Sequence, residues 1–183
     1  MGVVSSKQDA VFGRRSLADS NLKEIEIIWT IWTSYVKPCG PEFFSQVYTI
    51  VMEASSEIKA ELLRGSQRKR DSGDLTLLSY LPIRVANFFE KLFMKQKNGT
   101  FQHTVKEMST KCQILGGFHV NYSTIHYQTI FWDVFVLAAT EVMETKCSNR
   151  SKTFLWQQFL TSVVYDMKTG YESEMRRNFE NRN

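Results

Sequence analysis

The chain is poor in the residues that cross-link small folds or bind bare metal ions. Its 183 residues include only three cysteines and three histidines. Cys39, Cys112 and Cys147 lie far apart and form no C-x-x-C pair, which argues against a disulfide framework and against a zinc site. No apolar run approaches the roughly 18 residues that a membrane span requires.

Charge of one sign is not in large excess either. The 23 basic and 19 acidic side chains give a net charge of +4, and the basic residues do not gather into a stripe with interleaved aromatics. We therefore expect no nucleic-acid partner. What the chain does have is 43% hydrophobic residues, over a length that suits one soluble globular domain with a sizeable core.

The first residues lack the apolar h-region of a secretory signal. Three sequons of the form N-x-[ST] begin at Asn98, Asn121 and Asn149. Without a route into the secretory pathway we expect these matches to be accidental. The cytosol is the expected compartment.

The N-terminal stretch MGVVSS matches the M-G-x-x-x-[ST] pattern for N-myristoylation. Loss of Met1 would expose the amine of Gly2, which has no side chain to obstruct an acyltransferase, and Ser6 occupies the hydroxyl position. We expect Gly2 to be acylated and to hold the protein peripherally at the inner face of the plasma membrane or of another membrane. An ordinary flexible leader is the alternative.

One myristoyl chain gives only marginal membrane binding, about 10⁴ M⁻¹, so a second signal is needed. No cysteine lies beside Gly2. Electrostatic attraction to anionic lipids could come from Lys7, Arg14 and Arg15. A second basic cluster, which is more simply a solvated loop, comprises Arg64, Arg68, Lys69 and Arg70.

Period-two alternation is nearly absent, and the apolar residues recur at helical spacing instead. After a flexible leader at 1–18, breakers rich in Gly, Pro, Ser and Asn separate the helical stripes. The spacing predicts an all-α protein whose main helices lie near 19–36, 41–63, 75–96, 101–119, 123–146 and 151–173. A charged tail at 174–183 is expected to fray.

His119 lies on one of these stripes, where a histidine is usually a core or cap residue. The carbonyl of Leu115, four residues earlier, can accept from its Nδ1–H and leave Nε2 to bind a metal. No carboxylate or cysteine with metal-ligand spacing accompanies it, so a bare zinc or iron ion is not expected. One protein ligand suffices when a porphyrin fills the other positions. The many aromatic residues suit a flat cofactor, but they also suit an ordinary core.

The pattern Leu115-Gly116-x-x-His119, followed by Trp132-Asp133-Val134-Phe135, resembles the proximal segment of a globin, and of invertebrate, nematode-type globins in particular. The first helix agrees at Trp29, and Gly40 and Phe44 match the start of the second globin helix. The final helix agrees at Trp156, Leu160, Val163, Val164, Met167 and Gly170-Tyr171. The resemblance covers residues 19–173, so that range is the expected globin domain.

The resemblance implies a globin fold of about six to eight helices around a haem, iron protoporphyrin IX. It assigns His119 the role of proximal iron ligand, with Leu115 beside it. The remaining roles that it implies are Val85 over the haem, Arg84 as the partner of a haem propionate, Phe44 on the distal side and Phe135 in the wall behind the proximal face.

The chain departs from the family on the distal side. Leu81 occupies the position where many globins have histidine or glutamine. Pro82 would kink the helix or delay its start, and in the second case Tyr80 could face the iron in place of Leu81. An apolar distal side donates no hydrogen bond to O₂. We then expect fast O₂ release and ready oxidation, with CO or NO less disadvantaged.

Two further positions differ from the family pattern. The phenylalanine that globins hold between their second and fifth helices is missing, and Leu62 or Leu63 is its nearest substitute. The other imidazoles, His103 and His126, flank helix starts, so neither is expected to be a sixth ligand.

These features leave three functions open. The first is a haem-containing protein, not an enzyme, that reversibly binds O₂ or another diatomic gas for storage, transport or sensing. A membrane tether favours local sensing over bulk transport. The second is a haem redox or electron-transfer protein, or an enzyme that processes NO or nitrite, with a redox partner. The third is a globin fold that has lost haem.

The Gly2→Ala variant should move from the membrane fraction to the soluble fraction, because it lacks the glycine amine that the acyltransferase modifies. Fractionation of cells that express each form measures the shift. Unchanged partitioning would contradict the tether.

Overall fold

The computed structural model describes residues 15–71, 77–121 and 128–181, with the backbone alone for 65–71 and 77. In these ranges every named element is helical and there is no strand, so the predicted all-α class is confirmed. The α-helices are α1 (Leu22–Ile31), α2 (Pro41–Ala54), α3 (Ser56–Asp71), α4 (Leu77–Leu92), α5 (Val105–Val120), α6 (Ile130–Lys146) and α7 (Arg150–Glu180). Three short helical turns are η1 (Leu17–Asp19), η2 (Trp32–Val36) and η3 (Lys37–Cys39). No helix in the described ranges is long and apolar enough to cross a bilayer.

Side-chain caps explain where two helices begin. Asn21 caps α1 and Thr104 caps α5, each by accepting from the backbone N–H three residues later. The residues at those positions, Glu24 and Glu107, accept in return from the cap backbone, so both helices start with a capping box. At the start of α2, Gly40 adopts φ 54, a conformation that glycine tolerates best.

The predicted helix at 41–63 is two helices in the structure. Ser55 is extended (φ −144, ψ 113) and ends α2, and its hydroxyl accepts from the N–H of Ile58 at 3.3 Å as α3 begins. A serine that bonds its neighbouring backbone offers an alternative to helical hydrogen bonding, so one residue suffices for the break.

Two segments expected to be flexible are partly helical within the described residues. Residues 1–18 were expected to form a flexible leader, but Leu17 belongs to η1 and is only 1% exposed. The predicted frayed tail at 174–183 is also wrong in its first part, because α7 continues to Glu180. An ion pair between Glu174 and Arg177, spaced i,i+3, supports this last part of the helix.

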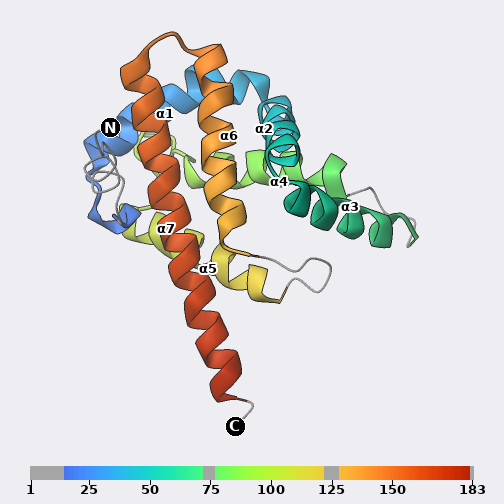
Figure 1. The fold of residues 1–183 in the computed structure, drawn as a ribbon. Coiled ribbons are helices and arrows are strands. Elements are labelled where there is room, and N and C mark those ends of the chain that lie inside the picture. The colour runs from blue at the N-terminus through green and yellow to red at the C-terminus, as the bar shows by residue number, and fades with distance from the viewer. Residues whose placement is uncertain (1–14, 72–76, 122–127, 182–183) are drawn as a thin grey trace, which may run out of the picture.

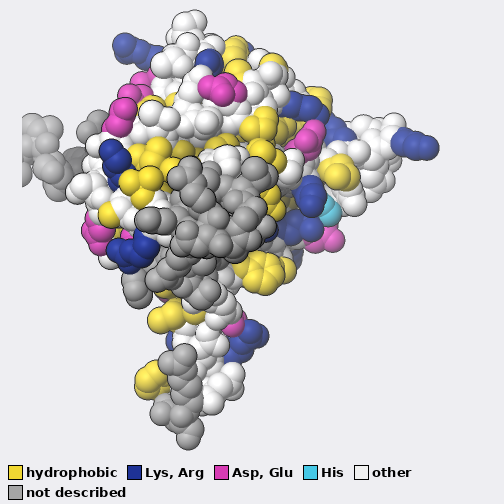
Figure 2. Space-filling view, turned by 90° about the vertical axis from the view of Figure 1, so that its right-hand side faces the viewer, with side chains coloured by type: hydrophobic (Ala, Val, Ile, Leu, Met, Phe, Trp, Pro, Cys, Tyr) yellow, Lys and Arg dark blue, Asp and Glu magenta, His cyan; other side chains and the backbone are white. Residues whose placement is uncertain are grey.

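Helices α6 and α7 form an antiparallel pair (Figure 1). A short connection joins them, and Lys168 of α7 pairs with Asp133 of α6 at 2.7 Å. In Figure 1, α1 crosses the upper end of the pair and α2 and α3 lie to its right. The last turns of α7 project below the body in both Figure 1 and Figure 2, and Phe179 there is 70% exposed.

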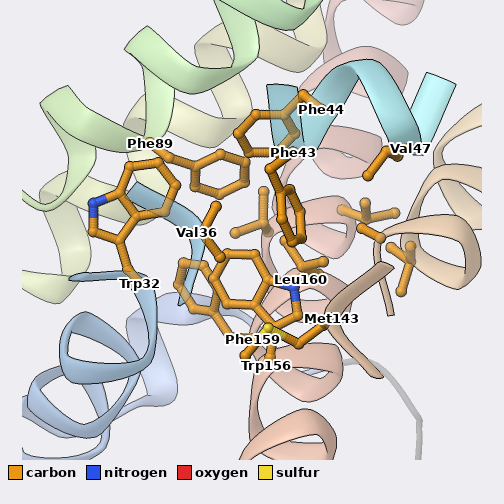
Figure 3. Packing of buried hydrophobic residues seen from close by; sticks show 14 of the residues in the cluster. Trp32, Val36, Phe43, Phe44, Val47, Phe89, Met143, Trp156, Phe159 and Leu160 are labelled. Atoms are coloured by element: carbon orange, nitrogen blue, oxygen red, sulfur yellow. The ribbon is translucent and has the colours of Figure 1, made fainter. Parts of the chain in front are cut away.

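The core is aromatic and is shared by α2, α4, α7 and η2 (Figure 3). Phe44 of α2 stacks on Phe89 of α4 with ring centroids 5.7 Å apart, and Phe43 meets the indole of Trp156 edge-on at 6.3 Å. The ring centroids of Trp32 and Phe89 lie 5.8 Å apart. Stacked and edge-on rings at these separations are favourable beyond the apolar area that they bury.

Helices α5 and α7 cross in direct backbone contact. A Cβ added to Gly116 of α5 would meet the backbone of Met167, and a Cβ added to Gly170 of α7 would meet the backbone of Gln113. Backbone atoms cannot rotate away as a flexible side chain can, so glycine alone fits at both positions. The crossing therefore fixes how closely the helix that carries His119 approaches α7.

Gly116→Ala and Gly170→Ala should each lower the free energy of unfolding by roughly 1–3 kcal/mol or more, since the added methyl forces the two helices apart. Gly117→Ala is the matched control, because its Cβ would lie 3.6 Å from the nearest atoms, an ordinary contact. Urea unfolding measures all three variants. Equal losses in the three would contradict the close crossing.

Candidate functional site

A cavity of about 670 Å³ lies between α4, α5, α6 and α7, with one residue from α2. Its volume falls in the range of about 300–1,000 Å³ that is typical of ligand and cofactor sites. Most of its lining is apolar. The lining residues are Tyr48, Leu81, Arg84, Val85, Phe88, Phe89, Leu115, Phe118, His119, Asn121, Trp132, Phe135, Leu160, Val163, Val164 and Met167.

The structure brings together six of the seven residues that the sequence assigned to the cofactor site. The predicted residues in the lining are Leu81, Arg84 and Val85 from α4, Leu115 and His119 from α5, and Phe135 from α6. Phe44 is not among the lining residues: it is 0% exposed and stacks on Phe89 and Phe135, one layer behind the cavity. Tyr48, one helical turn after Phe44, is the α2 residue that lines the cavity.

The imidazole of His119 is fixed by its own helix. Its Nδ1 lies 2.7 Å from the carbonyl oxygen of Leu115, as the i,i+4 spacing predicts. A carbonyl can only accept, so Nδ1 carries the proton, and in the neutral ring the lone pair is on Nε2. Burial lowers the pKa of His119, and the bond to Leu115 partly opposes that shift. The ring is therefore neutral near pH 7, the form that binds a metal.

A row of aromatic rings supports the same imidazole from α6 and α7. Trp132 meets His119 edge-to-face, with centroids 5.2 Å apart and planes at 79°. Tyr171 meets Trp132 in the same way at 5.9 Å. These contacts restrict rotation of the His119 ring beyond what its hydrogen bond alone would do. The sequence named Trp132 and Tyr171, but only as parts of a motif.

Helix α4 presents one face to the cavity, since Leu81, Val85 and Phe88 recur at i, i+4 and i+7. Pro82 lies inside α4, which begins at Leu77, so the alternative of a late helix start is wrong. Tyr80 is not in the lining, and the guanidinium of Arg84 lies 4.6 Å from the centre of its ring.

The polar side chains of the lining are few and differ in kind. They include the imidazole of His119, the guanidinium of Arg84, the amide of Asn121 and the hydroxyl of Tyr48. Among the described residues, no group of three or more His, Cys, Asp or Glu side chains could hold a metal ion. The site can thus give one nitrogen ligand to a metal that brings its remaining ligands, and one cation to an acidic group.

Other residues named from the sequence lie away from this cavity or outside the described ranges. Leu62 is buried, Leu63 is exposed, and neither lines the cavity. Arg15 and Arg64 form ion pairs with Glu24 and Glu61 at 2.8 Å each. His103 precedes α5, and the three cysteines are free thiols. Gly2, Lys7, Arg14 and His126 lie outside the described residues, as do the side chains of Arg68, Lys69 and Arg70.

Comparison of the chain with protein-family models, with curated proteins and with solved structures found no match in any of the three. The function is therefore inferred from the chemistry of the cavity.

Acid should destabilise the protein partly through His119. Burial holds its folded-state pKa below the value of about 6.5 in the unfolded chain. The unfolded chain then binds the proton more readily, so stability is lost as the pH falls from about 6.5 towards the folded-state pKa. Urea unfolding of cofactor-free protein at about pH 7.5 and about pH 5 should show a smaller loss for His119→Gln than for wild type. An equal loss in both proteins would contradict this account.

Proposed function

We propose that this chain is a haem protein with the globin fold that reversibly binds O₂ or another diatomic gas, with His119 as its ligand to the iron. One observation carries the proposal: an imidazole whose Nδ1 is held by the Leu115 carbonyl at 2.7 Å lines an apolar cavity of about 670 Å³. The all-helical architecture and the sequence resemblance both support the fold.

The residues of the cavity fit a haem. A lone imidazole is a sufficient protein ligand when a porphyrin fills the other positions around the iron. Arg84 lines the same cavity and is exposed, so its guanidinium can pair with a carboxylate of the porphyrin at the protein surface. Phe135 and Trp132 offer flat aromatic surfaces to a planar ring.

When bound, the haem provides the iron coordination position that a diatomic gas occupies. The side chains of the cavity orient the iron ligand and determine the polarity around the bound gas. Leu115 and Trp132 hold the His119 ring in one orientation, and Nε2 is the nitrogen that would contact the iron. Leu81 and Val85 donate no hydrogen bond, so we expect α4 itself to give O₂ no advantage over CO or NO.

Acylation of Gly2 would place this binding site at the cytosolic face of a membrane. A tethered protein samples gas only near that membrane, so local sensing or delivery suits it better than bulk transport. The tether rests on the sequence motif alone and is independent of the haem proposal.

A redox role is the second candidate, because Leu81 and Val85 cannot protect bound O₂ by hydrogen bonding. Electron transfer to a partner, or reaction with NO or nitrite, would suit such a site. A fold that had lost haem is less well supported, since side chains would be expected to fill the vacated space, whereas a cavity of about 670 Å³ remains.

Purified protein that is incubated with haemin and then freed of unbound haemin by gel filtration should show a Soret band, and His119→Ala should abolish it or leave haem loosely held. His103→Ala is the matched control, because His103 precedes α5 and does not line the cavity, so it should keep the wild-type spectrum. Absence of the band in wild type would end the haem proposal.

The rate at which O₂-saturated ferrous protein oxidises separates the two candidate functions. A gas store or carrier must stay ferrous for much longer than seconds, whereas oxidation within seconds would favour the redox role. Replacing Leu81 with glutamine, which can donate a hydrogen bond, should slow oxidation in either case.

A further inference from the structure

Asp166 on α7 does not line the cavity, although its neighbour Met167 does. It is only 1% exposed, and a buried carboxylate is costly unless it is hydrogen-bonded. Its Oδ1 accepts from the hydroxyl of Ser16 at 2.7 Å, and its Oδ2 accepts from the backbone N–H of Leu17 at 3.0 Å. Both oxygens therefore hold the N-terminal segment.

Ser16 is the centre of this attachment, which we call the N-terminal anchor and define by Ser16, Leu17, Ser109 and Asp166. The Ser16 hydroxyl also lies 3.1 Å from that of Ser109 on α5 and accepts from the N–H of Ala18, which caps η1. The Leu17 side chain is buried in the core. The anchor thus ties the start of the described chain to α5 and α7, the two helices that meet at the glycine crossing.

The position of Ser16 in the sequence adds a second, independent observation. Ser16 is partly exposed, and Arg14 and Arg15 directly precede it. Arg15 is exposed and pairs with Glu24 at the surface. Kinases select substrates by charge pattern, and a serine that follows two arginines suits an arginine-directed serine kinase.

We propose that Ser16 is a phosphorylation site and that its phosphorylation releases the N-terminal anchor, because the hydroxyl to be modified is the donor that a buried Asp166 depends on. The phosphoryl donor is a nucleoside triphosphate. The bond from Ser16 Oγ to the γ-phosphorus forms, the bond from that phosphorus to the β–γ bridging oxygen breaks, and the nucleoside diphosphate leaves. The hydroxyl proton passes to a base of the kinase.

The product cannot keep the geometry of the anchor. A phosphoserine carries a charge of about −1.5 to −2 and has no proton to donate in its ionised form. It would face the Asp166 carboxylate, at the oxygen that now accepts at 2.7 Å. Like charges in a buried setting repel strongly, so the segment at residues 15–20 moves away and Leu17 leaves the core. This inference does not rest on the proposed haem function.

The first test is modification itself. Full-length protein is incubated with Mg·ATP and a purified arginine-directed kinase, the catalytic subunit of cyclic-AMP-dependent protein kinase, and the phosphate is mapped by mass spectrometry. Wild type should carry phosphate on Ser16. Asp166→Asn should be modified faster, because its side chain holds the hydroxyl less firmly. Absence of phosphate from Ser16 in wild type would overturn the proposal.

The second test separates charge from simple loss of the hydroxyl. Hydrogen exchange of the Leu17 amide should be about tenfold faster in Ser16→Glu and in phosphorylated protein than in Ser16→Ala. Ser20→Glu is the matched control, because it adds the same charge to this segment outside the anchor. Far-UV circular dichroism confirms that each variant is folded.

A double variant tests the role of the Asp166 charge directly. Adding Asp166→Asn to Ser16→Glu removes the repulsion. The same change is added to Ser16→Ala, because Asp166 also accepts from the Leu17 N–H, and the two double variants should exchange at similar rates at Leu17. Equal exchange rates in Ser16→Ala and Ser16→Glu, or a difference between the double variants as large as that between the single ones, would overturn the proposed release.

Discussion

The close crossing of α5 and α7 is the constraint on which the pocket depends. Gly116 and Gly170 each face the backbone of the other helix, so the separation of the two helices is set by main-chain atoms. His119 lies one turn beyond Gly116, and Met167 lies one turn before Gly170, so the crossing fixes two parts of the cavity lining relative to each other. The aromatic core around Phe44 and Phe89 fills the neighbouring space and leaves the cavity as the remaining gap.

The chemistry of the pocket follows from how little polarity it contains. Burial keeps the imidazole of His119 neutral, the Leu115 carbonyl decides which nitrogen carries the proton, and Trp132 limits rotation of the ring. Each of these contacts lies on a rigid helix. A site of this kind orients one ligand atom well, and its α4 side is lined by the apolar side chains of Leu81, Val85 and Phe88.

Helical periodicity predicted most of the fold. A spacing of i, i+4 places Leu115 and His119 on one face of α5, and it places Leu81 and Val85 on one face of α4. The periodicity missed the break at Ser55, where no Gly or Pro marks the end of α2. The globin resemblance, not the periodicity, put Phe44 at the cavity, whereas Tyr48, one turn later, lines it. The contact of Ser16 with Asp166 joins residues 150 positions apart, so no local pattern could reveal it.

The N-terminal anchor also limits the distance between the folded domain and any lipid attached to Gly2. About 14 residues separate Gly2 from the fixed hydroxyl of Ser16. Such a stretch reaches at most about 50 Å when fully extended. An anchored body would therefore stay within roughly one domain diameter of the bilayer. Undocking as far as the Asn21 cap would add about five residues, or roughly 17 Å of reach, and would free the body to reorient.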